Sequence, residues 1–355
     1  MKKRLSIIAV LCCSICYGQE IFVRERIEKL NIPHKEEVVE HWISYAKAAQ
    51  LGEPTNHLWL DESRDFLLNF IPDFYRCFNQ TLSDLQFSED EQYRLIIHAE
   101  HISERRTGAT QGIDYQLNIV LTSQGWRLVN RFDIVKSRYK HYSTEHIDFY
   151  TLARPVTEEQ LLLTEQYLAA FTSHYGVTMK ERLTYIYCAD SEARALSDIG
   201  IIKIYNGENG VVGARYLVNP HTIIAPSLPH FHELVHAVMI PNYPNAPLLL
   251  HEGIAVLEGE TRKSKSHRRE EAIRYLSHNH IEFTTPEQLH ALLKDNGIVY
   301  YAVASAIIEY CLNVFGAKSV IQLFESTEYD GIFEQLGIAP LERTKFVYGL
   351  FGIQK

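Results

Sequence analysis

Residues 231–240 read FHELVHAVMI, and this stretch decides which fold the second half of the chain adopts. His232 and His236 are four positions apart, so on a helix their imidazoles lie one above the other on the same face. The residues around them are almost all apolar, which indicates a buried helix. Buried imidazoles need a polar partner, and one shared metal ion satisfies both. The spacing therefore predicts a Zn²⁺ site.

The residue after the first histidine is Glu233, which is placed to take a proton from metal-bound water without binding the metal itself. A third ligand is expected in residues 247–255, PLLLHEGIA, which predict a second buried helix. His251 and Glu252 are both candidates there. Glu252 is favoured, because a glutamate on an otherwise apolar helix needs a charged or metal partner. The expected metal ligands are thus His232, His236 and Glu252, with Glu233 as the general base.

HELVH followed by LHEGIA resembles the gluzincin metallopeptidases, the peptidase MA-like families related to thermolysin and aminopeptidase N. The resemblance implies a zincin-like catalytic domain over residues 151–355, a resident Zn²⁺ and a peptide or protein substrate. The third ligand of these families is the glutamate of a Glu-Gly-x-Ala motif, which corresponds to Glu252. A downstream tyrosine stabilises the oxyanion in aminopeptidase-like members. Tyr301 is the best match and Tyr300 the alternate, unless both are simply core residues of an apolar helix.

Three further expectations come with the resemblance. These families often carry an acidic residue seven positions after the ligand glutamate, but that position is Gly259 here, between Glu258 and Glu260. Which carboxylate takes this role is therefore open. A strand before the metal helix pairs with extended substrate, and the run 221–225 is expected to be this edge strand. No Gly-x-Met-Glu-Asn motif is present to hold a substrate amine, which favours an endopeptidase over an aminopeptidase.

The N-terminus is typical of an export signal. Three basic residues precede an apolar stretch of about a dozen residues, too short to span a membrane as a helix. Cleavage is expected after Gly18, and the layout resembles bacterial signals that direct export to the periplasm or beyond. Cysteines at positions 12, 13 and 16 leave lipoprotein anchoring as a second reading. No other stretch is expected to be apolar over 18 residues, so no membrane segment is expected in the mature chain.

Composition excludes several classes of protein. Among the 355 residues, 46% are hydrophobic and 11% aromatic, which excludes disorder as the main state. The net charge is −9 and becomes −12 without residues 1–18, so nucleic acid is not an expected partner. Three cysteines remain after the signal, too few and too uneven for a disulfide framework. A basic run at 262–269 (Arg262, Lys263, Lys265, His267, Arg268 and Arg269) reads as a solvated helix start, with recognition of an acidic substrate as the alternative.

The periodicity of the chain predicts an α+β fold. Residues 36–50 and 61–80 read as amphipathic helices, and residues 93–99, 115–121 and 126–132 alternate as the strands of an antiparallel meander. We therefore expect a small accessory α+β domain at 19–150, followed by the catalytic domain. In the latter, a helix at 157–174 opened by a capping box and a strand at 183–188 precede the metal helix, and the chain is mostly helical beyond Glu258.

Two classes of function fit this sequence. The first is an exported zinc metallopeptidase, in which residues 19–150 either deliver substrate or cover the site. The second is a non-catalytic binding or scaffolding protein with a structural or vestigial zinc site. Glu233 favours the enzyme, because a purely structural site has no need of a general base.

Overall fold

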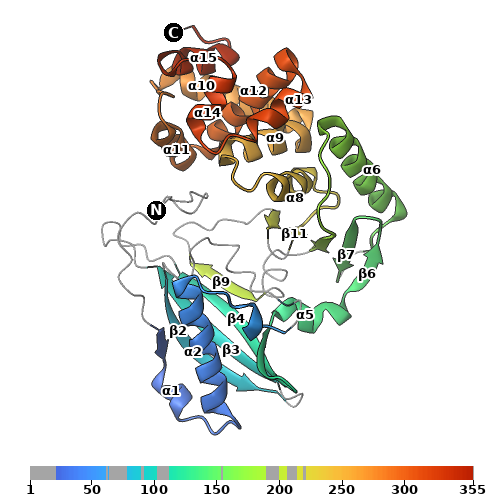
Figure 1. Cartoon of the computed structure of the whole chain (residues 1–355), viewed down its shortest axis with the longest axis vertical. Helices are drawn as coiled ribbons and strands as arrows, with labels where there is room; N and C mark the ends of the chain where they lie inside the picture. The colour runs from blue at the N-terminus through green and yellow to red at the C-terminus, as the bar shows by residue number, and fades with distance from the viewer. Residues whose placement is uncertain are drawn as a thin grey trace.

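The computed structural model describes residues 21–60, 63, 78–88, 92–101, 112–152, 155–188, 200–205, 214–218 and 221–354. The expected signal sequence lies outside these residues, as does most of the helix expected at 61–80. The described residues form a mixed α and β structure with two sheets and a helical C-terminal part (Figure 1). This arrangement is compatible with the predicted α+β class.

The first sheet contains the predicted meander. Its strands are β1 (Ile21–Val23), β2 (Phe78–Phe87), β3 (Gln92–His101), β4 (Gly112–Thr122), β5 (Gly125–Val129) and β9 (Ile201–Tyr205). Strands β2 to β5 pair in sequence order and antiparallel, as expected, while β1 adds parallel to β2. Strand β9 pairs with the first half of β4 (Figure 1). The second half of the same edge of β4 pairs with β5. A strand from the second half of the chain thus completes the first sheet.

Two of the sequence predictions in this sheet are wrong at their ends. Residues 78–80 belong to β2 and not to the expected helix. The sequence did not indicate a strand here because the pairing register shifts between Leu82 and Asp84, and this bulge interrupts the alternation of side chains that identifies a strand. The strand expected at 126–132 stops at Val129. There the Oδ1 of Asn130 accepts a hydrogen bond from the Phe132 N–H at 2.7 Å and starts helix α5 (Arg131–Val135).

Helix α2 (Lys35–Leu51) covers one face of this sheet and confirms the helix expected at 36–50. Its buried face carries Val38, Trp42, Tyr45 and Ala46, which join the alternate residues of the meander in one core. Gly52 ends the helix in the left-handed conformation. The short elements of this half are α1 (Glu25–Glu28), η2 (Asn56–Leu58) and η3 (Lys136–Arg138).

The second sheet lies between the first core and the helices. Its strands are β6 (Lys140–Ser143), β7 (Ile147–Thr151), β8 (Leu183–Tyr187), β10 (Arg215–Leu217) and β11 (Thr222–Ala225), in the order β10-β11-β8-β7-β6. Strands β7, β8 and β11 run parallel. Both faces are covered, since Ile186 and Ile224 pack into the first core while Tyr185 and Ile223 pack into the helical one. The expected division of the chain at residue 150 stays a prediction, and two strand pairs connect the segments on either side of it, β7 with β8 and β4 with β9.

Strand β11 is not the edge strand that was expected. It lies inside the sheet, with β8 on one side and the antiparallel β10 on the other, so its backbone groups are already paired. Among the strands that the structure describes, the edge belongs to β10, whose three residues carry too little pattern to be recognised in the sequence. The other local expectations of this region are confirmed. Helix α6 (Glu158–Tyr175) begins with the capping box of Thr157 and Gln160 and ends at Gly176.

The rest of the chain is helical, as predicted. It contains α8 (Phe231–Asn242), α9 (Leu248–Gly259), α10 (Arg262–His278), α11 (Pro286–Asp295), α12 (Gly297–Phe315), α13 (Ala317–Leu323), α14 (Tyr329–Gln335), η4 (Pro340–Glu342) and α15 (Arg343–Leu350). By length and composition α12 is apolar enough to cross a membrane, and half of that stretch is buried within the protein. The expectation that no other stretch is apolar over 18 residues is therefore wrong, while the expected absence of a membrane segment stays a prediction. Because α12 packs against α9, α10 and α15, it has the surroundings of a core helix, which passes the same test.

Candidate metal centre

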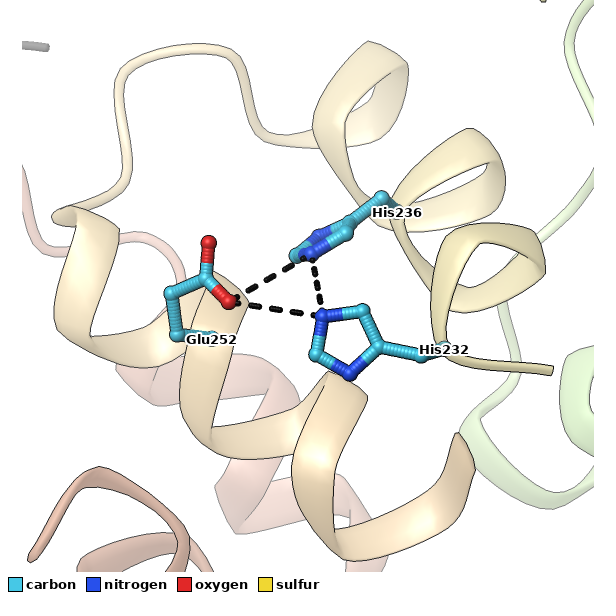
Figure 2. A group of neighbouring side chains, drawn as sticks. All are labelled: His232, His236 and Glu252. Atoms are coloured by element: carbon cyan, nitrogen blue, oxygen red, sulfur yellow. Dashed lines mark hydrogen bonds and ion pairs between the residues drawn. The ribbon is translucent and has the colours of Figure 1, made fainter. Parts of the chain in front are cut away.

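Helices α8 and α9 bring the three predicted ligands together. His232 and His236 project from successive turns of α8, and Glu252 projects toward them from α9 (Figure 2). The Nε2 atoms of the two histidines are 3.1 Å apart. The Oε2 atom of Glu252 lies 3.5 Å from the Nε2 of His232 and 3.6 Å from the Nε2 of His236. The described part of the chain thus gathers three ligand atoms at one point.

These three distances fit a tetrahedral zinc ion. Zinc holds nitrogen and oxygen ligands at about 2.0–2.1 Å, and the edge of such a tetrahedron is about 3.3–3.4 Å. The measured spacings of 3.1, 3.5 and 3.6 Å scatter around this edge. The donor set of two imidazole nitrogens and one carboxylate oxygen is also one that zinc prefers. A site with three protein ligands leaves a fourth position for water or substrate, which is the arrangement of catalytic centres.

The charges around this point are arranged for a cation. Glu252 is 7% exposed, and burial by itself raises the pKa of its carboxyl. The positive charge of His236 and hydrogen bonds from both histidines outweigh burial and hold that pKa well below its usual range. Burial likewise lowers the pKa of His236, but the carboxylates of Glu252 and Glu233 outweigh it and raise that pKa. The two buried carboxylates thus favour positive charge at the point where the three side chains meet.

Glu233 lies beside the three ligands without being one of them. Its side chain is almost fully buried, and burial raises the pKa of its carboxyl against the lowering effect of the two histidines. The backbone of Tyr216, in the edge strand β10, also lowers the pKa of this carboxyl. A buried carboxylate with a raised pKa is a stronger base than a solvated one. The edge strand β10 thus packs against α8, the helix that carries the expected general base.

The structure shows why position 259 carries no carboxylate. A Cβ atom on Gly259 would lie 2.4 Å from the Cα and backbone N of His232, so the end of α9 touches the start of α8 with no room for a side chain. Glu260 follows this contact, and its Oε1 lies 4.0 Å from the Nδ1 of His232. Glu258 points elsewhere and accepts a hydrogen bond from the Tyr175 hydroxyl at 2.6 Å. Of the two glutamates that the sequence left open, Glu260 is the one beside a candidate ligand.

His251, the other candidate for third ligand, has a separate role. Its Nε2 lies 3.1 Å from the Tyr243 carbonyl oxygen, and its ring packs edge-on against Phe324. Burial lowers its pKa to about 4, so the ring is neutral and serves as a hydrogen-bond donor to the backbone. It is therefore a core residue that fixes the loop between α8 and α9. His251 and Glu252 project to different sides of α9, which periodicity alone did not decide.

The two tyrosines at the start of α12 differ in their surroundings. Tyr300 is 3% exposed and buried in the helical core. Tyr301 is only partly buried, and the guanidinium of Arg268 lies 5.2 Å from the centre of its ring. Burial raises the pKa of Tyr301 to about 12, and the carboxylates of Glu252, Glu233 and Glu260 contribute to this shift. Its hydroxyl therefore stays protonated, as a hydrogen-bond donor must.

Neither a scan against protein-family models nor a search of the curated proteins finds a match for this chain.

Proposed function

We propose that this protein is a zinc-dependent metallopeptidase of the gluzincin type, with peptides or proteins as substrates. The observation that carries the proposal is the convergence of His232, His236 and Glu252 on one point, with the buried carboxylate of Glu233 beside them. The resemblance of the two motifs to gluzincins supports it. A structural zinc site would close its coordination with a fourth protein ligand and would not need a buried base.

The residues of the site divide the work of amide hydrolysis. Zinc, when bound, supplies a water of lowered pKa and polarises the scissile carbonyl. Glu233 accepts the proton of the attacking water and passes it to the nitrogen of the leaving amine. Its raised pKa suits both steps, because the carboxylate is a better base and its protonated form persists nearer neutral pH. Tyr301 supplies a neutral hydroxyl that can donate a hydrogen bond to the oxyanion.

The proposal is tested by Glu233→Gln, which removes the base but keeps the shape of the side chain. The purified wild type should contain one zinc ion per chain and should cleave members of a broad peptide library. The variant should keep the zinc ion and lose about 10²–10⁴-fold in turnover, as expected for the loss of a general base. Metal content is measured by atomic absorption and cleavage by mass spectrometry.

Glu258→Gln is the matched control, because Glu258 is a glutamate of α9 that hydrogen bonds to Tyr175 and not to the ligands. It should keep both zinc and turnover. The non-catalytic alternative makes the opposite prediction. If wild type and Glu233→Gln both bind zinc stoichiometrically and neither cleaves any peptide, the site is structural and the enzyme proposal is wrong.

A further inference from the structure

Arg268 contacts two residues around the candidate metal centre, Glu260 and Tyr301, although the sequence presents it as one residue of a solvated basic run. Its Nε donates to the Oε2 of Glu260 at 2.8 Å and its Nη2 donates to the Oε1 at 2.6 Å. Two parallel bonds of this kind fix the plane of a carboxylate as well as its position. The side chains of Arg268 and Glu260 are only 22% and 11% exposed, so this pair is largely removed from solvent.

Glu260 is held from a second direction by the same helix. The hydroxyl of Ser264, one turn before Arg268 on α10, donates to the Oε2 of Glu260 at 2.6 Å. The three bonds together occupy both oxygens of the carboxylate and hold it in one orientation. The fixed carboxylate faces the Nδ1 of His232 at 4.0 Å. A negative charge on this side favours the tautomer with the proton on Nδ1 and leaves the Nε2 lone pair free for a metal ion.

The other face of Arg268 meets the expected oxyanion residue. Its guanidinium lies over the ring of Tyr301, at 5.2 Å from the ring centre, and this contact joins α10 to α12. The cation opposes the other charges around Tyr301 by lowering the pKa of the hydroxyl. One side chain therefore contacts both the carboxylate beside a metal ligand and the tyrosine that lies near the site.

We propose that Arg268 is a positioning residue of the metal centre, which holds Glu260 against His232 and holds the ring of Tyr301 beside the site. This inference rests on the proposed function, because it concerns the same zinc site. It also explains why a basic residue is found here in an acidic chain. The charge of Arg268 is used within the protein and is not offered to solvent or to an acidic substrate.

The test is the zinc affinity of Arg268→Gln, measured by competition with a chromophoric chelator. Removing a residue that orients a metal ligand through its partner lowers metal affinity about 10–100-fold, and we expect a loss in this range. Arg268→Lys keeps the charge but not the two parallel bonds and should fall between the wild type and Arg268→Gln. Urea unfolding of the metal-free proteins shows whether each variant folds.

Arg269→Gln is the matched control. Arg269 is the next residue of α10, and it bonds to the Leu350 carbonyl oxygen and lies over the ring of Phe351, away from the ligands. Its loss should leave zinc affinity unchanged. The same measurement in a Glu260→Gln background shows whether Arg268 affects zinc affinity through Glu260 or independently of it. If Arg268 acts through Glu260, Arg268→Gln should lower affinity much less in that background than in the wild type.

The possible outcomes separate this inference from the function. A wild type that binds no zinc contradicts the proposed function itself. A wild type that binds zinc, with Arg268→Gln binding it equally well, overturns only the role of Arg268. An equal loss in Arg269→Gln, or a full additional loss in the Glu260→Gln background, shows a general effect on the fold and also overturns the positioning role.

Discussion

Replacing Gly259 by alanine tests the close contact between the helices that carry the ligands. The new Cβ would lie 2.4 Å from two backbone atoms of His232 and 2.8 Å from the carbonyl carbon of Phe231. Carbon atoms in relaxed contact are about 3.5–4.0 Å apart, so the start of α8 and the end of α9 must separate by about 1 Å. Backbone atoms cannot turn aside as a flexible side chain would, and the separation therefore moves His232 relative to Glu252.

Two effects on stability oppose each other at this position. Alanine is favoured over glycine in a helix by up to about 1 kcal/mol. Overpacking of a tight contact costs about 1–3 kcal/mol, so we expect a net loss of about 0–2 kcal/mol. The effect on the metal is larger, because zinc tolerates ligand displacements of only about 0.2 Å. Zinc affinity should fall at least about 10-fold.

The assays are urea unfolding and competition for zinc with a chromophoric chelator. Gly349→Ala is the control, since Gly349 lies in helix α15 and a Cβ there would meet nothing within 4 Å. That variant should gain up to about 1 kcal/mol and bind zinc as the wild type does. A Gly259→Ala protein that is as stable as Gly349→Ala and binds zinc with wild-type affinity would refute the reasoning, because the two helices could not then be in contact at this point.

Three further predictions concern other residues. Tyr301→Phe should keep its zinc and lose about 10²–10³-fold in turnover, as expected for the loss of a hydrogen-bond donor to the oxyanion. If turnover in a peptidase assay is unchanged, another residue stabilises the oxyanion. His251→Ala should lose about 2–5 kcal/mol of unfolding free energy as a buried side chain with a backbone partner, yet keep a zinc ion at saturating metal; a zinc-free but folded variant would make His251 a ligand. Asp148 bonds to Arg182, Ser143 and His141, and these partners hold its pKa far below the usual value of 3.8. Its contribution to the free energy of unfolding is therefore present above pH 3.8 and is lost as the pH falls further. Asp148→Asn should lower the free energy of unfolding by about 1 kcal/mol at pH 7 and by less at pH 3, and a loss that does not change with pH contradicts this.

Local signals in the sequence predicted the elements that begin or end by local chemistry. The capping box at Thr157 correctly predicted a helix start, because a cap depends only on residues three or four positions apart. The spacing of His232 and His236 placed two side chains on one helix face for the same reason. The position of Glu252 beside them was expected from the family resemblance and from its apolar surroundings.

The remaining features depend on residues far apart in the chain. The pairing of β9 with β4 joins segments separated by about ninety positions, and no periodicity within either strand indicates it. The role of Glu260 follows from the contact between Gly259 and His232, which is a property of two packed helices. Arg268 looked solvated because its neighbours in sequence are basic and exposed, whereas its own partners lie on α9 and α12.

The pairing of the strands limits how this protein can be divided. A fragment that starts at residue 151 would lack nearly all of β7, the parallel neighbour of β8, and would leave β9 without β4. Two sheet edges would then be open to association with other chains. An experiment that removes residues 19–150, to ask whether they cover the site, would therefore measure aggregation of the remaining fragment and not the uncovering of the site. The same pairing means that residues 151–355 cannot be exchanged between proteins as a self-contained module, so substitutions within the whole chain are the way to study the candidate site.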